Sequence, residues 1–187
     1  MDNNIFSRSI LGGISIMIAS YIYINVGGIY GAILFSIGLL IILNMSLKLF
    51  TGTVGYIGTK NYLKTNALIL TGNLIGCITA MLFQNQISQE LMERKLSLPF
   101  GTTLANSIIC GVLVYTAVDC FRMKKDYMVP LCVTGFIMFG AEHCIADLCY
   151  ALMSSEMSIK VILFLLIVTF GNAIGAIMMN IGTKGGV

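Results

Sequence analysis

Three ionisable side chains within six residues mark the part of this chain that could do chemistry. Glu142, His143 and Asp147 lie in the sequence FGAEHCIADL at residues 139–148, and His143 is the only histidine. The surrounding run, residues 127–153, is otherwise apolar. A charged side chain inside a bilayer costs about 2.5–3.5 kcal/mol on insertion scales, so such groups persist mainly where they face a cavity or a partner. The cluster therefore favours a functional site over simple packing.

A continuous helix through this segment would place His143 and Asp147 on one face, because they are four residues apart. Phe136 and Cys132 precede His143 by seven and eleven residues and fall on or close to that face. Glu142 would point about 100° away, toward a neighbouring helix or the backbone. The order cysteine, phenylalanine, histidine, aspartate along one face is typical of a pore lining or a proton relay.

The composition indicates a polytopic membrane protein. Of the 187 residues, 57% are hydrophobic and 10% are charged, and the mean hydropathy is +0.92. Soluble domains carry about 25% charged residues. Since a span needs about 20 apolar residues, we expect one transmembrane domain over residues 1–187 with six helices, at 10–26, 29–47, 66–83, 100–121, 127–153 and 159–181. The net charge of +3 gives no reason to expect a nucleic-acid partner.

The six cysteines all lie in or at the ends of apolar runs, where we expect them to pack as small buried side chains without forming disulfides. Cys144 and Cys149 lie close to His143, but their spacing matches no common set of metal ligands. We therefore expect no metal centre and no cofactor.

The chain also contains an internal repeat. GNLIGCI at residues 72–78 matches GNAIGAI at residues 171–177, in the third and the sixth predicted span. Because three spans lead to each copy, the halves, about 10–84 and 100–182, would have opposite orientations, as in many transporters and channels. The glycines allow close helix packing. The amide of Asn172 needs partners if buried, and could bond to the backbone of the fifth span or donate toward a pore.

Each copy of this motif follows a segment that is unfavourable for a continuous helix. Residues 48–58 end the second span and include three glycines and two threonines, and residues 140–147 interrupt the fifth span. Irregular backbone at membrane depth is tolerated where it lines a cavity. The sequence therefore predicts a site near the bilayer midplane, between the second and fifth spans.

These motifs, in this order, resemble those of the formate/nitrite transporter family, which includes hydrosulfide channels. The resemblance covers nearly the whole chain and rests on LFTGTV at 49–54, the G-N-x-x-G of the third span, NSIIC at 106–110, EHCIA at 142–146 and TFGNAIG at 169–175. It implies an all-α, aquaporin-like fold of six helices with the second and fifth broken. It also implies a homopentamer with one pore per protomer, and small monovalent anions of weak acids as substrates.

The resemblance implies roles for single residues as well. Thr53 takes the position of the family's loop threonine, and Phe136 that of its slit phenylalanine. An apolar residue of the second span near Ile41 would face Phe136, Lys95 would lie in the vestibule, and Asn106 would belong to the pore region.

Two residues depart from the family pattern. Asp147 stands where asparagine is usual, and Cys144 stands where serine is common. An ionised Asp147 would repel an anion near His143. If it is paired with His143, it could instead hold the imidazole in its protonated form. The sequence leaves both arrangements open.

We expect a passive or proton-coupled channel or transporter for formate or a similar anion. A bare anion faces a large desolvation cost at Phe136, and protonation to the neutral acid removes most of it. His143 is the expected proton donor, because histidine titrates near pH 6.5. Thr53 would offer a hydroxyl group to the substrate or to His143, while Asn172 and Glu142 would brace the broken helices.

Other functions remain open at this point. Hydrosulfide and nitrite are alternative substrates. A membrane enzyme using His143, Glu142 and Cys144 would lack a second histidine, a cofactor motif and a sizeable polar face. A packing subunit without a pore is a third possibility.

Basic residues predict the orientation of the chain in the cell (inner or plasma) membrane. With the N-terminus inside, seven basic residues lie on the inner side and three on the outer side, which favours two cytoplasmic termini. The inner set is Arg8, Lys60, Lys64, Arg122, Lys124, Lys125 and Lys184, and the outer set is Arg94, Lys95 and Lys160.

Overall fold

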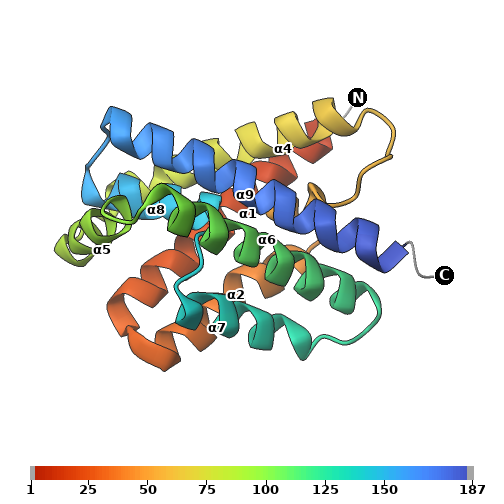
Figure 1. Ribbon diagram of the computed structural model, residues 1–187, viewed down its shortest axis with the longest axis horizontal. Helices are drawn as coiled ribbons and strands as arrows, with labels where there is room; N and C mark the ends of the chain where they lie inside the picture. Colours follow the sequence, from red (N-terminus) through yellow and green to blue (C-terminus); the bar gives the residue numbers. More distant parts are fainter. Residues whose placement is uncertain (1–2, 185–187) are drawn as a thin grey trace.

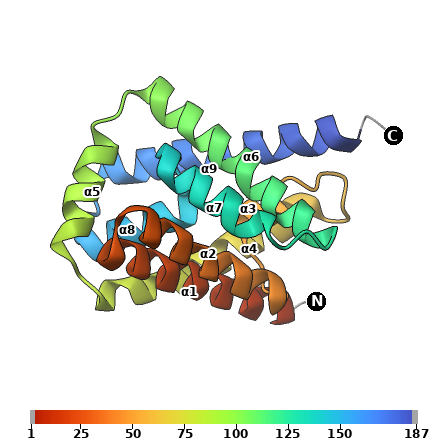
Figure 2. The ribbon, with the colours of Figure 1, turned by 90° about the horizontal axis from the view of Figure 1, so that it is seen from below.

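The computed structural model describes residues 3–184 as a bundle of helices. In chain order these are α1 (Asn3–Val26), α2 (Gly28–Asn44), α3 (Phe50–Thr53), α4 (Tyr62–Cys77), the 3-10 helix η1 (Ile78–Leu82), α5 (Gln86–Leu96), α6 (Phe100–Arg122), α7 (Met128–Phe139), α8 (Cys144–Ser154) and α9 (Ile159–Lys184). Helix α1 begins and α9 ends at one end of the molecule, here called the terminal end, and α5 lies at the other, the α5 end (Figures 1 and 2).

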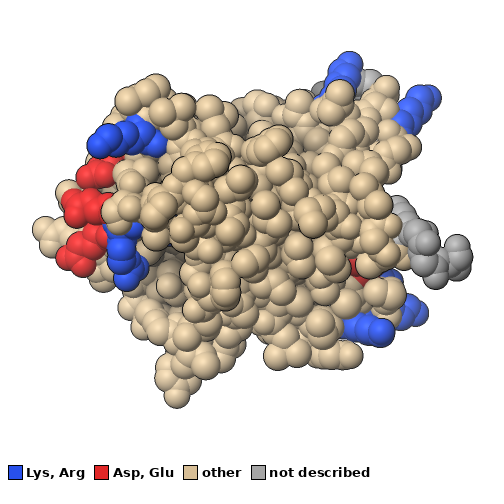
Figure 3. All heavy atoms as spheres, viewed as in Figure 1, with Lys and Arg blue, Asp and Glu red and all other residues tan. Residues whose placement is uncertain are grey.

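The helices have the length and composition expected for a membrane protein. Within residues 3–184, four helical stretches are long and apolar enough to cross a bilayer: α1, α4 with η1, α6 and α9. Helices α7 and α8 pass the same test only as a pair, bent by 56° at the break between them, and the apolar α2 is shorter. On the face shown in Figure 3, charged side chains lie at the two ends and an uncharged band separates them.

Glycines bring the long helices of each half into close contact. A Cβ atom added at Gly76 in α4 would overlap the carbonyl oxygen of Ile10 in α1. A Cβ atom at Gly175 in α9 would overlap the carbonyl oxygen of Ile108 in α6 in the same way. Both glycines belong to the repeated motif, so the motif fixes the α1–α4 and α6–α9 contacts, as expected for small residues one turn apart.

The repeated asparagine of the second half holds the break between α7 and α8. Asn172 Oδ1 accepts a hydrogen bond of 2.9 Å from the backbone N–H of Cys144, the first residue of α8. Its Nδ2 donates to the carbonyl oxygens of Ser107 and Glu142, each at 2.8 Å. One buried amide thereby satisfies two backbone groups that the interrupted helix could not satisfy within itself, and its bond to Ser107 ties them to α6.

Asn73 makes the equivalent bonds in the first half. Its Oδ1 accepts from the N–H of Phe50, the first residue of α3, at 2.8 Å. Its Nδ2 donates to the carbonyl oxygens of Ser9 at 2.7 Å and Lys48 at 2.8 Å. Helices α1 and α4 run away from the terminal end, whereas α6 and α9 run toward it (Figure 2). The two halves therefore repeat one architecture in opposite directions.

The two breaks differ in the length of the helix that comes after each of them. After α2, the chain forms one short helical turn, α3, before a loop leads to α4, whereas α7 is succeeded by the longer α8. The fifth predicted span, residues 127–153, is therefore broken between Phe139 and Cys144. Gly140 supplies the turn with a φ of +78°, a conformation that favours glycine.

We predict that Asn73→Ala and Asn172→Ala each lower the thermal stability of the detergent-solubilised protein. Each change leaves one buried N–H and two buried carbonyl oxygens without the amide that served them, and an unsatisfied buried group costs about 1–3 kcal/mol. The control is Asn44→Ala, because the exposed Asn44 side chain donates only to Leu40 O of its own helix. Equal melting temperatures for all three variants in a fluorescence-detected thermal ramp would contradict this role.

Candidate functional site

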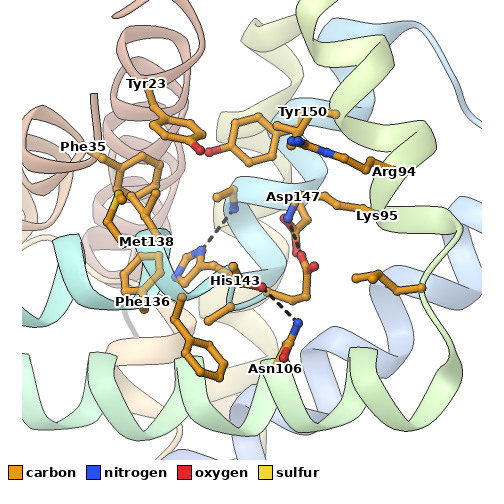
Figure 4. A pocket seen from close by; sticks show the side chains of 18 residues that line it. Tyr23, Phe35, Arg94, Lys95, Asn106, Phe136, Met138, His143, Asp147 and Tyr150 are labelled. Atoms are coloured by element: carbon orange, nitrogen blue, oxygen red, sulfur yellow. Dashed lines mark hydrogen bonds and ion pairs between the residues drawn. The ribbon is translucent and has the colours of Figure 1, made fainter. Parts of the chain in front are cut away.

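A cavity of about 380 Å³ lies between the broken helix α7–α8 and helices α1, α2, α5 and α6. One part of its wall is aromatic and apolar, with Tyr23, Phe35, Phe136, Met138 and Tyr150. The other part is polar, with Arg94, Lys95, Asn106, Glu142, His143 and Asp147 (Figure 4). We call it the first cavity.

A second cavity of about 200 Å³ is lined by α2, α3, α6 and the chain between α2 and α3. Helix α2 lines both cavities, with Phe35 in the first and Leu39, one turn later, in the second. Since α2 runs along the bundle, the two cavities follow one another along it. Thr51, beside the second-cavity residue Gly52, reaches His143 of the first cavity. The Thr51–His143 pair thus lies between the two cavities, and we call the route through both cavities and past this pair the passage.

His143 uses both of its ring nitrogens. It is the residue before α8, and its Nδ1 accepts a hydrogen bond of 3.1 Å from the backbone N–H of Ala146, which caps the helix. Its Nε2 lies 2.9 Å from Thr51 Oγ1. Because Nδ1 is an acceptor, the neutral ring carries its hydrogen on Nε2 and donates it to Thr51. The Thr51 hydroxyl group then keeps its own hydrogen for a further hydrogen bond.

Two phenylalanines form the apolar frame around this histidine. The Phe136 ring is stacked with the imidazole at a centroid distance of 6.0 Å and an interplanar angle of 14°. Phe35 meets Phe136 edge-on, with centroids 5.9 Å apart. All three rings are buried. The region between the two cavities, here called the narrow part of the passage, is therefore apolar apart from the Thr51–His143 pair.

Phe136 lines the first cavity, whereas Ile41, near which the second span was expected to face Phe136, does not line it. Ile41 is half-buried and lines neither cavity. The residues of α2 that line the two cavities are Phe35, Leu39, Ile42 and Leu43, at the i, i+4, i+7 and i+8 spacing of one helical face. Ile41 precedes Ile42 by one residue and so points about 100° away from it.

Thr53 was expected to offer its hydroxyl group to the substrate or to His143, and the threonine that bonds to His143 is Thr51. Thr53 Oγ1 instead donates to Asn66 Oδ1 at 2.9 Å, while its side chain lines the second cavity. In the single turn of α3, residues two apart point about 200° from one another. Nothing in the sequence distinguishes the two threonines until the first residue of that turn is known.

The predicted face shared by Cys132, Phe136, His143 and Asp147 does not exist as a continuous stripe. It assumed an unbroken helix, whereas the chain is extended at His143, with φ of −114° and ψ of 112°. The His143 side chain folds back onto Ala146, so Asp147 in the first turn of α8 does not pair with it. In Figure 4 the Asp147 carboxylate points toward Lys95, away from the imidazole.

Asp147 belongs to a buried ionic cluster with Lys95 and Glu142. Lys95 Nζ lies 3.0 Å from Asp147 Oδ1 and also forms an ion pair with Glu142 Oε2. Their side chains are 13%, 1% and 2% exposed in the order Lys95, Asp147, Glu142. Burial lowers the pKa of Lys95, but the two carboxylates outweigh it and raise that pKa above its usual value. The lysine expected in the vestibule is therefore present, protonated, and already paired with two acids.

The linker between α7 and α8 is held on both sides. Asn106 Nδ2 donates to the carbonyl oxygen of Gly140 at 3.0 Å, and the backbone carbonyl of Asn106 accepts from the N–H of Glu142. Asn172 holds the carbonyl of the same Glu142. Of the two arrangements considered for Asn172, the structure shows the bond to the broken backbone.

Taken together, apolar helices, two opposed broken segments and two cavities joined at a buried polar pair define a membrane transport protein with a passage through its own helical bundle. The sequence matches the formate/nitrite transporter family over residues 3–184, and the chain belongs to this family. It is a membrane anion channel of that family and not an enzyme. The family predicted from the sequence is therefore confirmed, and solved structures with the same architecture confirm the all-α membrane fold.

Two solved structures share this fold. A "pentameric formate channel with formate bound" is 24% identical, with a TM-score of 0.81, over 96% of this chain and 94% of that chain. An "FNT family ion channel" is 18% identical, with a TM-score of 0.85, over 98% of this chain and 90% of that chain. A search of curated proteins gave no significant match.

We predict that Thr51→Val lowers anion flux about tenfold, whereas Thr53→Val changes it less than about twofold. Each change replaces a hydroxyl by a methyl of similar volume, but only Thr51 bonds to His143. Loss of one buried hydrogen bond corresponds to about 1–1.5 kcal/mol, or roughly a factor of ten. The measurement is the initial rate of formate uptake into proteoliposomes at equal protein content. A larger loss in Thr53→Val would contradict the assignment.

Proposed function

We propose that this protein is a channel or transporter for small monovalent anions of weak acids, with formate the expected substrate, and that the substrate crosses the narrow part of the passage as the neutral acid. The observation that carries the proposal is the Thr51–His143 pair, 2.9 Å apart, enclosed by the rings of Phe35 and Phe136. This pair offers hydrogen bonds to a small polar molecule at a point where the rest of the wall is apolar.

The charges of the two cavities support an anionic substrate. Arg94 and Lys95 line the first cavity, and Lys48 and Arg122 line the second. Basic residues at both mouths raise the local concentration of anions. The aromatic frame opposes a bare charge, because burial of an ion without a partner is far more costly than burial of a neutral acid. Attraction at the mouths and exclusion in the middle together favour protonation on the way.

His143 is proposed as the group that donates to the substrate in the middle of the passage. In the resting state it can offer Nε2–H to an oxygen of the substrate, alone or through the Thr51 hydroxyl group. To give up a proton it must first be protonated on Nδ1, which breaks the bond from Ala146 N–H. The N-terminus of α8 also disfavours a positive charge there. The ring therefore serves chiefly as a hydrogen-bond donor and gains a full charge only transiently.

The assembly and orientation are part of this proposal. The related formate channel of known structure is pentameric, and we propose a homopentamer here, with one passage per protomer. We propose that the terminal end faces the cytoplasm, because the larger set of basic residues lies there, and that the α5 end and the first cavity face outward. Cross-linking in membranes that stops at dimers would contradict the pentamer.

The proposal is tested by reconstituting the purified protein into liposomes. Formate, nitrite and hydrosulfide are offered side by side, since the narrow polar pair could serve all three. We expect formate uptake well above that of protein-free vesicles. Greater uptake of nitrite or hydrosulfide would change the assigned substrate, and vesicles inert to all three would overturn the proposed function.

We predict that His143→Asn lowers the maximal rate of formate uptake by about tenfold or more, while the protein keeps its thermal stability. Asparagine is among the best residues for capping a helix N-terminus, so the Ala146 N–H keeps an acceptor. The substrate loses the imidazole donor in the apolar frame. Uptake rates and melting temperatures are measured on the same preparation, and an unchanged maximal rate would remove His143 from the mechanism.

A further inference from the structure

The cluster of Lys95, Glu142 and Asp147 has an excess of acid. One ammonium group contacts oxygens of two carboxylates, and all three side chains are almost completely enclosed. If both acids are ionised, the cluster carries a net charge of −1 in the wall of a cavity that receives anions. Two carboxylates that share one site resist double ionisation, so such a pair tends to retain a proton.

One atom of this cluster has no partner. Among residues 3–184, Asp147 Oδ2 is one of two buried side-chain oxygen or nitrogen atoms without a hydrogen bond, and the other, Ser20 Oγ, is a neutral hydroxyl. Asp147 lines the first cavity. A buried carboxylate oxygen without a donor is costly. A proton on Oδ2 removes that cost and creates a donor that can face a molecule in the cavity.

The groups around Asp147 do not cancel its charge. The titratable and charged side chains near it are Tyr23 from α1, Arg94 and Lys95 from α5, Cys110 from α6, Glu142 and His143 from the linker, and Cys144 and Tyr150 from α8. Of these, the cations are Lys95, which is shared with Glu142, and Arg94, which is exposed. The others are neutral or acidic.

We propose that Asp147 holds an exchangeable proton and transfers it to the anion in the first cavity, so that the neutral acid enters the passage. This inference rests on the proposed function and names a proton-binding site for it. The O–H bond at Asp147 Oδ2 breaks and an O–H bond forms on the anion. Asp147 is left as a carboxylate paired with Lys95, and a proton from the solution at the α5 end restores the acid. No electrons are exchanged.

The geometry gives each group a separate task. Arg94 draws the anion into the first cavity, Asp147 supplies the proton, and His143 donates a hydrogen bond to the neutral acid within the aromatic frame. His143 is less suited to supply the proton itself, because its Nδ1 already accepts the N–H of Ala146. The side chain that stores the proton, Asp147, thus differs from the side chain at the narrow part of the passage, His143, although both lie close to the α7–α8 break.

The test measures protein-dependent formate uptake between about pH 5 and about pH 8 at a constant concentration of formate anion. The bulk concentration of neutral acid then falls about tenfold per pH unit. A protein with its own proton store should keep a nearly constant rate until that store loses its proton, and the rate should fall only above that pH. We expect this plateau in the wild type and in Asp147→Glu, which keeps the acid.

Asp147→Asn should lack the plateau, and its rate should fall about tenfold per pH unit throughout, following the neutral acid in solution. The matched comparison is His143→Asn, which should have a lower rate but the same plateau. The inference is overturned if Asp147→Asn keeps the plateau or if the wild type lacks it. It is equally overturned if His143→Asn alone loses the plateau. A rate that changes when sodium and potassium are replaced by a large organic cation would also overturn it, because a metal cation and not a proton would then accompany the anion. The proposed function survives each of these results, because formate still crosses.

A second measurement does not depend on transport. The infrared spectrum of the detergent-solubilised protein should contain a carboxylic-acid C=O band that disappears at high pH. The band should be absent from Asp147→Asn and present in Asp147→Glu, which keeps a second carboxyl group beside Lys95 and Glu142. A band unchanged in Asp147→Asn would show that the proton is held elsewhere and would overturn the assignment.

Discussion

The passage depends on how the backbone is satisfied where two helices stop inside an apolar bundle. A helix that ends at membrane depth leaves N–H and C=O groups without partners, and lipid offers none. Asn73 and Asn172 supply these partners from the neighbouring helices, each by accepting from the first N–H of the next helix and donating to two carbonyl oxygens. The glycines beside them bring the supporting helices close enough for this contact. The breaks can therefore persist and open cavities on either side.

The break between α7 and α8 also determines the separate roles of His143 and Asp147. Because α8 starts at Cys144, His143 is its capping residue and not part of a continuous helix, so its ring is fixed between Ala146 N–H and the Thr51 hydroxyl group. Asp147 is turned to the opposite side, where Lys95 and Glu142 hold it. A hydrogen-bonding group and an acidic group that are four residues apart thus serve different parts of the passage.

The sequence was sufficient for the features that depend on local pattern. The repeated motif predicted two opposed halves, and the glycines and polar residues located both breaks, beside which Phe136 and Asn172 lie. Prediction from the sequence failed where the direction of a side chain depends on its position relative to the first residue of a helix after a break. Thr51 and Thr53, or Ile41 and Ile42, differ by a rotation that only the helix start determines. The pairing of Asp147 with Lys95 joins residues from distant elements, α8 and α5, and no local pattern contains it.

The central claim, that the substrate crosses as a neutral acid, is tested most directly by the effect of membrane voltage on formate uptake. Proteoliposomes with a potassium gradient and valinomycin can be set to potentials of either sign at constant pH. One charge moved through about 100 mV corresponds to about 2.3 kcal/mol, or roughly fiftyfold in equilibrium accumulation. The account predicts that accumulation is the same at both signs of the potential. Accumulation that rises with a positive interior would show that the bare anion crosses and would contradict it.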